Sequence, residues 1–154
     1  MELVKELVAL VSELKREKIE FALCGGMAMA VYAFPRATMD IDIMIEPGSL
    51  TKVKKTAEKL GFSFDSGMME FKKGAIKIYR LVKTESGAEE ELVLDLLVVT
   101  DKTKKIWQMR KEVSWEKGTL PVISPEGMIG LKTMRNTGQD KDDIEHLKGL
   151  INES

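Results

Sequence analysis

The stretch Leu-Cys-Gly-Gly-Met-Ala at positions 23–28 and the stretch Asp-Ile-Asp-Ile at positions 40–43 decide the fold of this chain. An apolar run that ends at two glycines predicts a strand followed by a tight turn, and the residues from Met27 to Phe34 then predict a short helix. Backbone N–H groups at such a strand-to-helix turn are well placed to receive a phosphate. The second stretch predicts another strand, from Thr38 to Ile45.

Asp40 and Asp42 stand two residues apart on that second strand, so both side chains project from one face. They are then about 7 Å apart along the strand. Two such carboxylates can hold one or two divalent cations, and paired cations clamp the oxygens of a phosphoryl group during transfer. An all-carboxylate site favours Mg²⁺ or Mn²⁺. The same alternation also describes a half-exposed strand whose polar face meets water. The combination with the glycine turn favours the chemical interpretation.

At this spacing the two stretches resemble the signature of the nucleotidyltransferase superfamily, which includes DNA polymerase beta and the aminoglycoside nucleotidyltransferases. The fuller pattern, Gly-Gly-Met-Ala followed by Arg36-x-Thr38-x-Asp40-x-Asp42, is most similar to the small AbiEii-type toxins and their relatives. The resemblance implies an α+β nucleotidyltransferase fold, in which a mixed β-sheet is flanked by helices. It also implies metal-dependent transfer of a nucleoside monophosphate from an NTP to a hydroxyl or phosphate of an unknown acceptor, with release of pyrophosphate.

The resemblance assigns roles to the residues of the motif. The two glycines would hold the β- and γ-phosphates through their backbone N–H groups, and the two aspartates would bind the metal ions at the α-phosphate. Many members of the family carry Ser directly after the glycines, whereas Met27 offers only its backbone N–H. The predicted nucleotide-binding residues are Gly25, Gly26, Met27, Arg36, Thr38 and Lys132.

A third carboxylate, Asp95, lies in the middle of the apolar segment from Leu92 to Val99. Burying a lone carboxylate costs on the order of several kcal/mol unless it is paired or bound to a metal. Two interpretations stay open: a core aspartate satisfied by an arginine or by backbone N–H groups, and, as the superfamily resemblance implies, a third catalytic and metal-binding carboxylate. In the second interpretation Asp95 helps to deprotonate the acceptor.

The sequence Ser-Pro-Glu at positions 124–126 predicts the start of a helix, on which Lys132 and Arg135 share a face. Together with Asp140-x-x-Asp143, this segment resembles the tail of the same AbiEii-like group. Lys132 would then steady the triphosphate. The alternative is a pair of solvated cations on a surface helix. Asp143 is interpreted as an acid of a first helical turn or as a partner for Lys132.

Elsewhere the periodicity of apolar residues predicts further helices and strands. Leu3 to Leu14 predicts an amphipathic helix, and Leu50 to Leu60 a second one capped by Ser49. Short antiparallel strands are expected at 62–64, 69–71 and 75–82, and a small hairpin about positions 117–118.

The composition places limits on the class of protein. A chain of 154 residues with 44% hydrophobic and 32% charged residues predicts one globular domain, residues 1–154. The net charge of -1 gives no global basic field for nucleic acid. The single cysteine, Cys24, excludes an internal disulfide and favours the cytoplasm, and no apolar run suggests a membrane span. The scarcity of Asn and Gln favours a thermophilic source.

Two functional hypotheses follow from the sequence. The first is a nucleotidyltransferase that uses Mg²⁺ or Mn²⁺, an NTP and an acceptor that is a small molecule, a protein or tRNA, working as a homodimer or with a partner protein. The second is a non-catalytic nucleotide- or protein-binding module of the same fold, such as one half of a toxin–antitoxin pair. Three carboxylates that converge beside the glycine turn would favour the enzyme, and an Asp95 locked to a buried arginine would favour the module.

Overall fold

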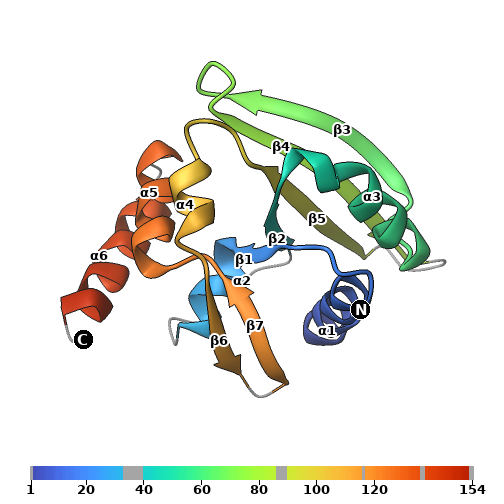
Figure 1. The fold of residues 1–154 in the computed structure, drawn as a ribbon, viewed down its shortest axis with the longest axis horizontal. Helices are drawn as coiled ribbons and strands as arrows, with labels where there is room; N and C mark the ends of the chain where they lie inside the picture. Colours follow the sequence, from blue (N-terminus) through green and yellow to red (C-terminus); the bar gives the residue numbers. More distant parts are fainter. Residues whose placement is uncertain (1, 33–39, 86–89, 116, 136–137, 153–154) are drawn as a thin grey trace.

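The computed structural model describes residues 2–32, 40–85, 90–115, 117–135 and 138–152. A seven-stranded mixed sheet runs through its centre and is flanked by helices (Figure 1), which confirms the α+β architecture expected from the sequence. Along the sheet the strands lie in the order β3-β4-β5-β2-β1-β7-β6. The strands are β1 (Ala22–Cys24), β2 (Asp40–Ile45), β3 (Phe64–Phe71), β4 (Ile76–Thr84), β5 (Glu91–Val98), β6 (Lys111–Trp115) and β7 (Gly118–Val122).

Most helices follow the predicted segments, but α2 (Gly25–Val31) begins at Gly25 and not at Met27, so the two glycines form the first turn of the helix instead of a separate turn before it. Described helices are α1 (Leu3–Arg16), α2 (Gly25–Val31), α3 (Leu50–Lys59), α4 (Lys104–Gln108), α5 (Pro125–Arg135) and α6 (Gly138–Asn152), with a 3₁₀ turn, η1, at Pro47–Ser49. None of these helices is both long and apolar enough to cross a membrane.

β2 and β5 form the centre of the sheet and pair in parallel, whereas β1 joins β2 in antiparallel fashion. Side chains alternate between the two faces of each strand. On β2 the three isoleucines, Ile41, Ile43 and Ile45, are fully buried on one face, and Asp40 and Asp42 lie on the other. The alternation read from the sequence therefore separates a core face from a polar face.

α1 and α3 cover the core face of the sheet (Figure 1). The leucines of α1 at positions 7, 10 and 14 are fully buried there. At the margin, Lys83 of β4 donates hydrogen bonds of 2.9 and 3.0 Å to the carboxylate of Glu6 on α1. Lys54 of α3 donates to the hydroxyl of Tyr79 on β4 at 2.9 Å. The opposite face of β4 carries Arg80 and is not covered by these two helices.

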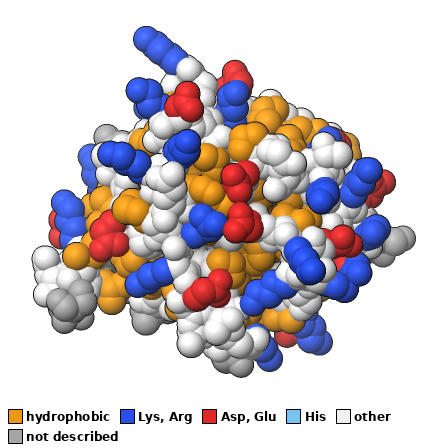
Figure 2. All heavy atoms as spheres, in the orientation of Figure 1, with side chains coloured by type: hydrophobic (Ala, Val, Ile, Leu, Met, Phe, Trp, Pro, Cys, Tyr) orange, Lys and Arg blue, Asp and Glu red, His pale blue; other side chains and the backbone are white. Residues whose placement is uncertain are grey.

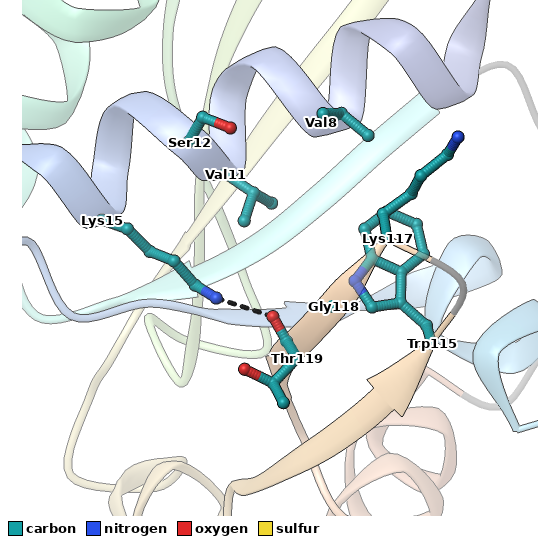
Figure 3. A pocket seen from close by; sticks show the side chains of 8 residues that line it. All are labelled: Val8, Val11, Ser12, Lys15, Trp115, Lys117, Gly118 and Thr119. Carbon is teal, nitrogen blue, oxygen red and sulfur yellow. Dashed lines mark hydrogen bonds between the residues drawn. The ribbon is translucent and has the colours of Figure 1, made fainter.

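The β6–β7 hairpin packs beside α1 and leaves a shallow pocket of about 260 Å³ between them (Figure 3). Val8 and Val11 of α1 and Trp115 of β6 form its apolar part. The ammonium of Lys15 donates a 2.6 Å hydrogen bond to the carbonyl of Thr119, so the pocket is closed at one end by a link between helix and hairpin.

The structure corrects two further expectations. The two short strands predicted at 62–64 and 69–71 are one strand, β3, because Gly67 forms a bulge within it instead of a turn. Gly67 has a φ of +82°, which glycine adopts without strain, and the pairing with β4 slips by one residue between Asp65 and Gly67. Ser49 does not cap α3 through its side chain, since it ends the 3₁₀ turn that leads into the helix.

α5 begins as the sequence predicts, with Ser124 as its cap. The backbone N–H of Gly127 donates a 3.1 Å hydrogen bond to the hydroxyl of Ser124, which is buried. Gly127 itself packs tightly, because an added Cβ would lie 2.7 Å from Ile123 and 3.1 Å from Ile106 of α4. The start of α5 is therefore fixed both by its cap and by its contact with α4.

We expect Ser124→Ala to lower the free energy of unfolding by about 1 kcal/mol, since the first turn of α5 loses a side-chain acceptor. Chemical denaturation followed by circular dichroism measures the change. Ser12→Ala on the exposed side of α1 is the matched control, and it should leave stability within about 0.5 kcal/mol of the wild type. Equal effects of the two substitutions would contradict the capping role of Ser124.

Candidate active site

The glycine turn lies directly against the carboxylate of Asp42. Gly25 begins α2 with a φ of +70°, a conformation that side chains other than glycine rarely adopt. A Cβ added at Gly25 would overlap the carboxylate of Asp42. Gly26 and Met27 follow in the first turn of α2, and both are buried. The sequence motif is thus a physical contact: position 25 must be glycine for Asp42 to lie where it does.

A single row of paired residues crosses the centre of the sheet beside this turn. Cys24 pairs with Asp42, Asp42 with Asp95, Asp95 with Arg80, and Arg80 with Gly67. Directly paired residues point to the same face, and neighbouring strands are about 4.8 Å apart. The predicted third carboxylate therefore lies next to the predicted pair, on the same face of the sheet.

Burial, together with the crowding of negative charge, changes the ionisation of these carboxyl groups. Burial, and then the charges of Asp95 and Asp40, raise the pKa of Asp42 to about 7, although Arg135 and Lys132 oppose the shift. Burial and Asp95 also raise the pKa of Asp40 above its usual range. A shift of this kind means that the site favours either a proton or a cation at Asp42.

Asp95 is held by an ion pair with Arg80 from the neighbouring strand. Nε of Arg80 donates to Oδ1 of Asp95 at 2.8 Å, and Nη2 donates to Oδ2 at 2.9 Å. The side chain of Asp95 is 9% exposed and that of Arg80 is 38% exposed. A buried arginine bound to Asp95 would favour the non-catalytic module, but Arg80 is only partly buried. The ion pair alone therefore does not decide between the enzyme and the module.

The carboxylates of Asp40 and Asp42 are suitable ligands for a divalent cation, although the described residues do not form a complete coordination site. Asp40 and Asp42 offer carboxylate oxygens on one face, which suit Mg²⁺ or Mn²⁺. The guanidinium of Arg80 forms an ion pair with the neighbouring Asp95. Among the residues that the structure describes, however, no three His, Cys, Asp or Glu side chains are grouped so that they could hold a metal ion.

Lys132 does not lie on the surface as one of the two sequence interpretations had it. Its side chain is 4% exposed, and its ammonium lies 3.0 Å from a carboxylate oxygen of Asp143 and 3.9 Å from one of Asp140. Both aspartates are buried between α5 and α6. The expectation that Asp143 is a partner for Lys132 is confirmed, and the pair ties the two helices together.

Arg135 is the more accessible cation of this helix. It donates hydrogen bonds of 2.8 and 2.5 Å to the two oxygens of Asp140, which is fully buried, while its own side chain is 58% exposed. This hydrogen bonding to Asp140 raises the pKa of Arg135, and the charge of Asp42 adds to the shift. Arg135 is therefore a firmly oriented guanidinium that the field of the carboxylate cluster reaches.

The sequence analysis and the structure do not name the same set of site residues. The expected Arg36 and Thr38 lie outside the described residues. Arg80 and Asp140 were not singled out as site residues. The signal for Arg80 was a lone charge on an otherwise apolar strand face, and only the strand register connects it to Asp95.

Comparison with protein families decides what kind of protein this is. The model of the family described as nucleotidyl transferase AbiEii toxin, type IV toxin–antitoxin system, matches residues 8–146. The chain belongs to the AbiEii nucleotidyltransferase toxin family. Membership makes it a nucleotidyltransferase by descent and confirms the resemblance read from the glycine and aspartate motifs.

Solved structures support the fold of this AbiEii family member. A Thermotoga maritima protein, TM1012, described as a nucleotidyltransferase, is 18% identical, with a TM-score of 0.59 over 98% of this chain and 93% of its own. The antibiotic-resistance factor ANT(2'')-Ia is 14% identical, with a TM-score of 0.66 over 96% of this chain and 83% of its own. JHP933 from Helicobacter pylori is 18% identical, with a TM-score of 0.55 over 93% of this chain and 63% of its own. Comparison with curated proteins gave no match.

We expect Gly25→Ala to destabilise the protein by about 2 kcal/mol or more, because the new methyl group strains the backbone and displaces Asp42. Thermal unfolding measures the change. Gly48→Ala is the matched control, since a Cβ there meets no atom within 4 Å. A Gly25→Ala protein as stable as Gly48→Ala would contradict the close packing of the turn on Asp42.

The raised pKa of Asp42 predicts a pH dependence of stability. Because the folded pKa is about 7 and the unfolded one about 4, the wild type without divalent cations should lose stability as pH rises from 4 to 7. We expect the contribution of Asp42 to be on the order of 2 kcal/mol, which is less than the full linkage value because water still reaches part of this residue. Urea denaturation in EDTA measures it. Asp42→Asn should flatten the slope, and identical slopes for both proteins would contradict the shift.

Proposed function

We propose that this AbiEii family member transfers a nucleoside monophosphate from an NTP to an acceptor, with release of pyrophosphate, in a reaction that depends on Mg²⁺ or Mn²⁺. The observation that carries the proposal is the contact between the Gly25 turn and the carboxylate of Asp42, which lies beside Asp40 and Asp95. Family membership and the fold of the solved relatives support nucleotidyl transfer in general.

In this proposal the residues of the turn and of β2 position the two substrates of the reaction. Gly25, Gly26 and Met27 offer backbone N–H groups of the first turn of α2 to the triphosphate. Asp40 and Asp42 hold the cation, which when bound neutralises charge at the α-phosphate. Their work is placement and electrostatics, so no covalent protein intermediate is needed.

Asp95 and the residues outside the described part complete the set proposed from the sequence. Asp95 remains a proposed catalytic and metal-site carboxylate, and its contact with Arg80 is the feature that governs how it takes part. Arg36 and Thr38 stay proposed nucleotide-binding residues.

We propose that α5 helps to bind the triphosphate through two cationic side chains, Lys132 and Arg135, which have different roles. Lys132 is buried between Asp140 and Asp143, so it acts by fixing α6 against α5 and by its charge near Asp42. Arg135 is half-exposed and oriented by Asp140, so its guanidinium can reach a phosphate oxygen. This shares between two residues the role that the sequence resemblance gave to Lys132.

The acceptor, in our proposal, approaches along the sheet face that carries Asp95. Strand register places Phe64 and Phe71 of β3 on that face, and their residues are 63% and 47% exposed. Acidic and basic side chains are mixed over the face seen in Figure 2, with hydrophobic atoms between them. One of the solved relatives, ANT(2'')-Ia, holds adenylyl-2''-tobramycin. For the present chain a small molecule, a protein and tRNA all stay open as acceptors.

We propose further that residues 1–154 act as one domain in the cytoplasm, because strands that range from Ala22 to Val122 share one sheet and the single cysteine is free and buried. A homodimer or a partner protein, as in a toxin–antitoxin pair, stays part of the proposal.

One observation favours a second function. The ion pair between Asp95 and Arg80 has one part of the geometry expected of a non-catalytic nucleotide- or protein-binding module, since an arginine holds Asp95, although the side chain of that arginine is 38% exposed. The two functions differ in whether an NTP binds in a manner that depends on a divalent cation.

Calorimetric titration of the four NTPs, with and without Mg²⁺, tests the proposal. We expect at least one NTP to bind the wild type in a Mg²⁺-dependent manner, and Asp42→Asn to weaken that binding at least tenfold. Asp142→Asn changes an exposed aspartate of α6 and is the matched control, which should bind as the wild type does. Binding to neither the wild type nor Asp142→Asn, in folded samples, would overturn the catalytic proposal and favour the module.

A further inference from the structure

β3 forms one edge of the sheet, and β6 forms the other (Figure 1). In an antiparallel pair, every second residue of β3 turns its N–H and C=O toward β4, and the residues between them turn these groups outward. In the part of the chain that the structure describes, no strand pairs with this outer edge. β3 therefore offers a row of hydrogen-bonding groups to a further strand.

β3 also carries an excess of exposed apolar side chains. Among the described residues, five large hydrophobic side chains are exposed, and three of them, Phe64, Met68 and Phe71, lie on this one strand. Register with β4 places Phe64 and Phe71 on the face that carries Asp95, and Met68 on the core face. Exposed apolar side chains on both faces of an edge strand make it a template for pairing with another chain.

The opposite edge of the sheet has a different character. On β6 the exposed residues are Lys111, Glu112 and Ser114, whereas the apolar Val113 and Trp115 are partly covered. Charged side chains on an edge strand oppose pairing with a further strand. Of the two edges, β3 is therefore the one suited to an interface.

The regular part of β3 is complementary to itself. It runs from Gly67 to Phe71, after the bulge, and a twofold axis through Met69 pairs this segment antiparallel with the same segment of a second copy. Phe71 then lies opposite Gly67 of the second copy, where an aromatic ring covers a strand position that has no side chain of its own. Met69 lies opposite its counterpart, and Met68 lies opposite Glu70.

Neighbouring registers are less favourable. Because directly paired residues point to one face, the alternative registers differ by two residues. A shift in one direction sets Glu70 opposite Glu70 of the second copy, and like charges in that position repel. A shift in the other direction sets Phe71 opposite Asp65, beyond the bulge, where the regular pairing ends. One register is therefore preferred.

Charges at the two ends of this pairing are complementary as well. Lys72 and Lys73 belong to the exposed turn that follows β3. In the preferred register Lys73 lies beside Asp65 of the second copy, and the side chain of Asp65 is 44% exposed. The twofold axis repeats this contact at the other end of the pairing.

We propose that the β3 edge is the interface of a homodimer, in which two copies of the chain pair antiparallel from Gly67 to Phe71 and their sheets become continuous. The partner is a second copy because the segment complements itself in apolar contacts, in register and in charge. The inference goes beyond the proposed function and does not rest on it. In this dimer the faces that carry Asp95 lie on the same side, so the surface proposed for the acceptor continues from one copy to the other.

Sedimentation velocity over a range of concentrations tests the inference. The paired segment is shorter than a standard interface, so we expect a weak dimer with a Kd of about 10 to about 100 µM. The average mass should rise from one chain toward two chains between about 5 µM and about 1 mM protein. A wild type that stays monomeric at about 1 mM would overturn the inference and favour a different chain as the partner of β3.

Two substitutions of Met68 test the register. Met68→Glu sets a carboxylate opposite Glu70 of the second copy, at two symmetric places, and should weaken the dimer at least tenfold. Met68→Lys sets an ammonium there, so its dimer should be at least tenfold tighter than that of Met68→Glu. Equal affinities of the two variants would overturn the inference.

Met109 provides matched controls for the change in net charge. It is 45% exposed and lies at the end of α4, outside the sheet. Met109→Glu and Met109→Lys make the same changes of charge away from the interface, so both proteins should dimerise within twofold of the wild type. If these two differ as much as the Met68 variants do, net charge controls the association and the inference is overturned.

Phe64→Ser separates edge pairing from face-to-face packing of two sheets. Phe64 precedes the bulge and lies outside the paired segment, so its loss should weaken the dimer less than threefold. It is also 63% exposed on the face that carries Asp95. A tenfold weakening would therefore mean that the dimer forms through that face, and it would overturn the inference.

A measurement on the wild type alone covers the case in which the Met68 variants do not fold. Amide hydrogen exchange of residues 67–71 should slow between about 5 µM and about 1 mM protein, because the outward N–H groups become paired. Exchange of residues 111–115, on the other edge, should not depend on concentration. Slowing at neither edge, or at both edges alike, would overturn the inference.

Discussion

The parallel, in-register pairing of β2 with β5 is the constraint on which the candidate site depends. It brings Asp42 and Asp95, which are 53 positions apart in the sequence, to neighbouring positions on one face of the sheet. The antiparallel neighbours extend the same row to Cys24 on one side and to Arg80 on the other. A slip of one residue at any of these pairings would send a member of the row to the core face. Burial of the isoleucines of β2 on the core face therefore maintains the register that places the carboxylates on the other face.

The site has a second half that is built by different means. The sheet supplies carboxylates through strand register, whereas α5 and α6 supply cations through a buried network of Lys132, Arg135, Asp140 and Asp143. Charge on one half is felt by the other, since Arg135 and Lys132 partly offset the rise in the pKa of Asp42. The electrostatics of the site thus belongs to the packing of the helices as much as to the strand that carries the motif.

The sequence was most informative where a local pattern has one physical meaning. Alternation on β2, the glycine turn and the serine cap of α5 all predict local geometry, and the fold class follows from them. The single strand β3 escaped prediction because a glycine bulge and a glycine turn look the same in one sequence. The Arg80–Asp95 pair escaped because it depends on register between strands, and the burial of Lys132 escaped because it depends on how α6 docks.

The buried ammonium of Lys132 has a consequence for the order in which the chain acquires its structure. Its two counter-ions, Asp140 and Asp143, follow it in the sequence, on α6. Until they arrive, α5 can bury Lys132 only at the expense of an uncompensated charge. We therefore expect α5 and α6 to dock onto the sheet as a pair, because each supplies the charges that allow the other to be buried.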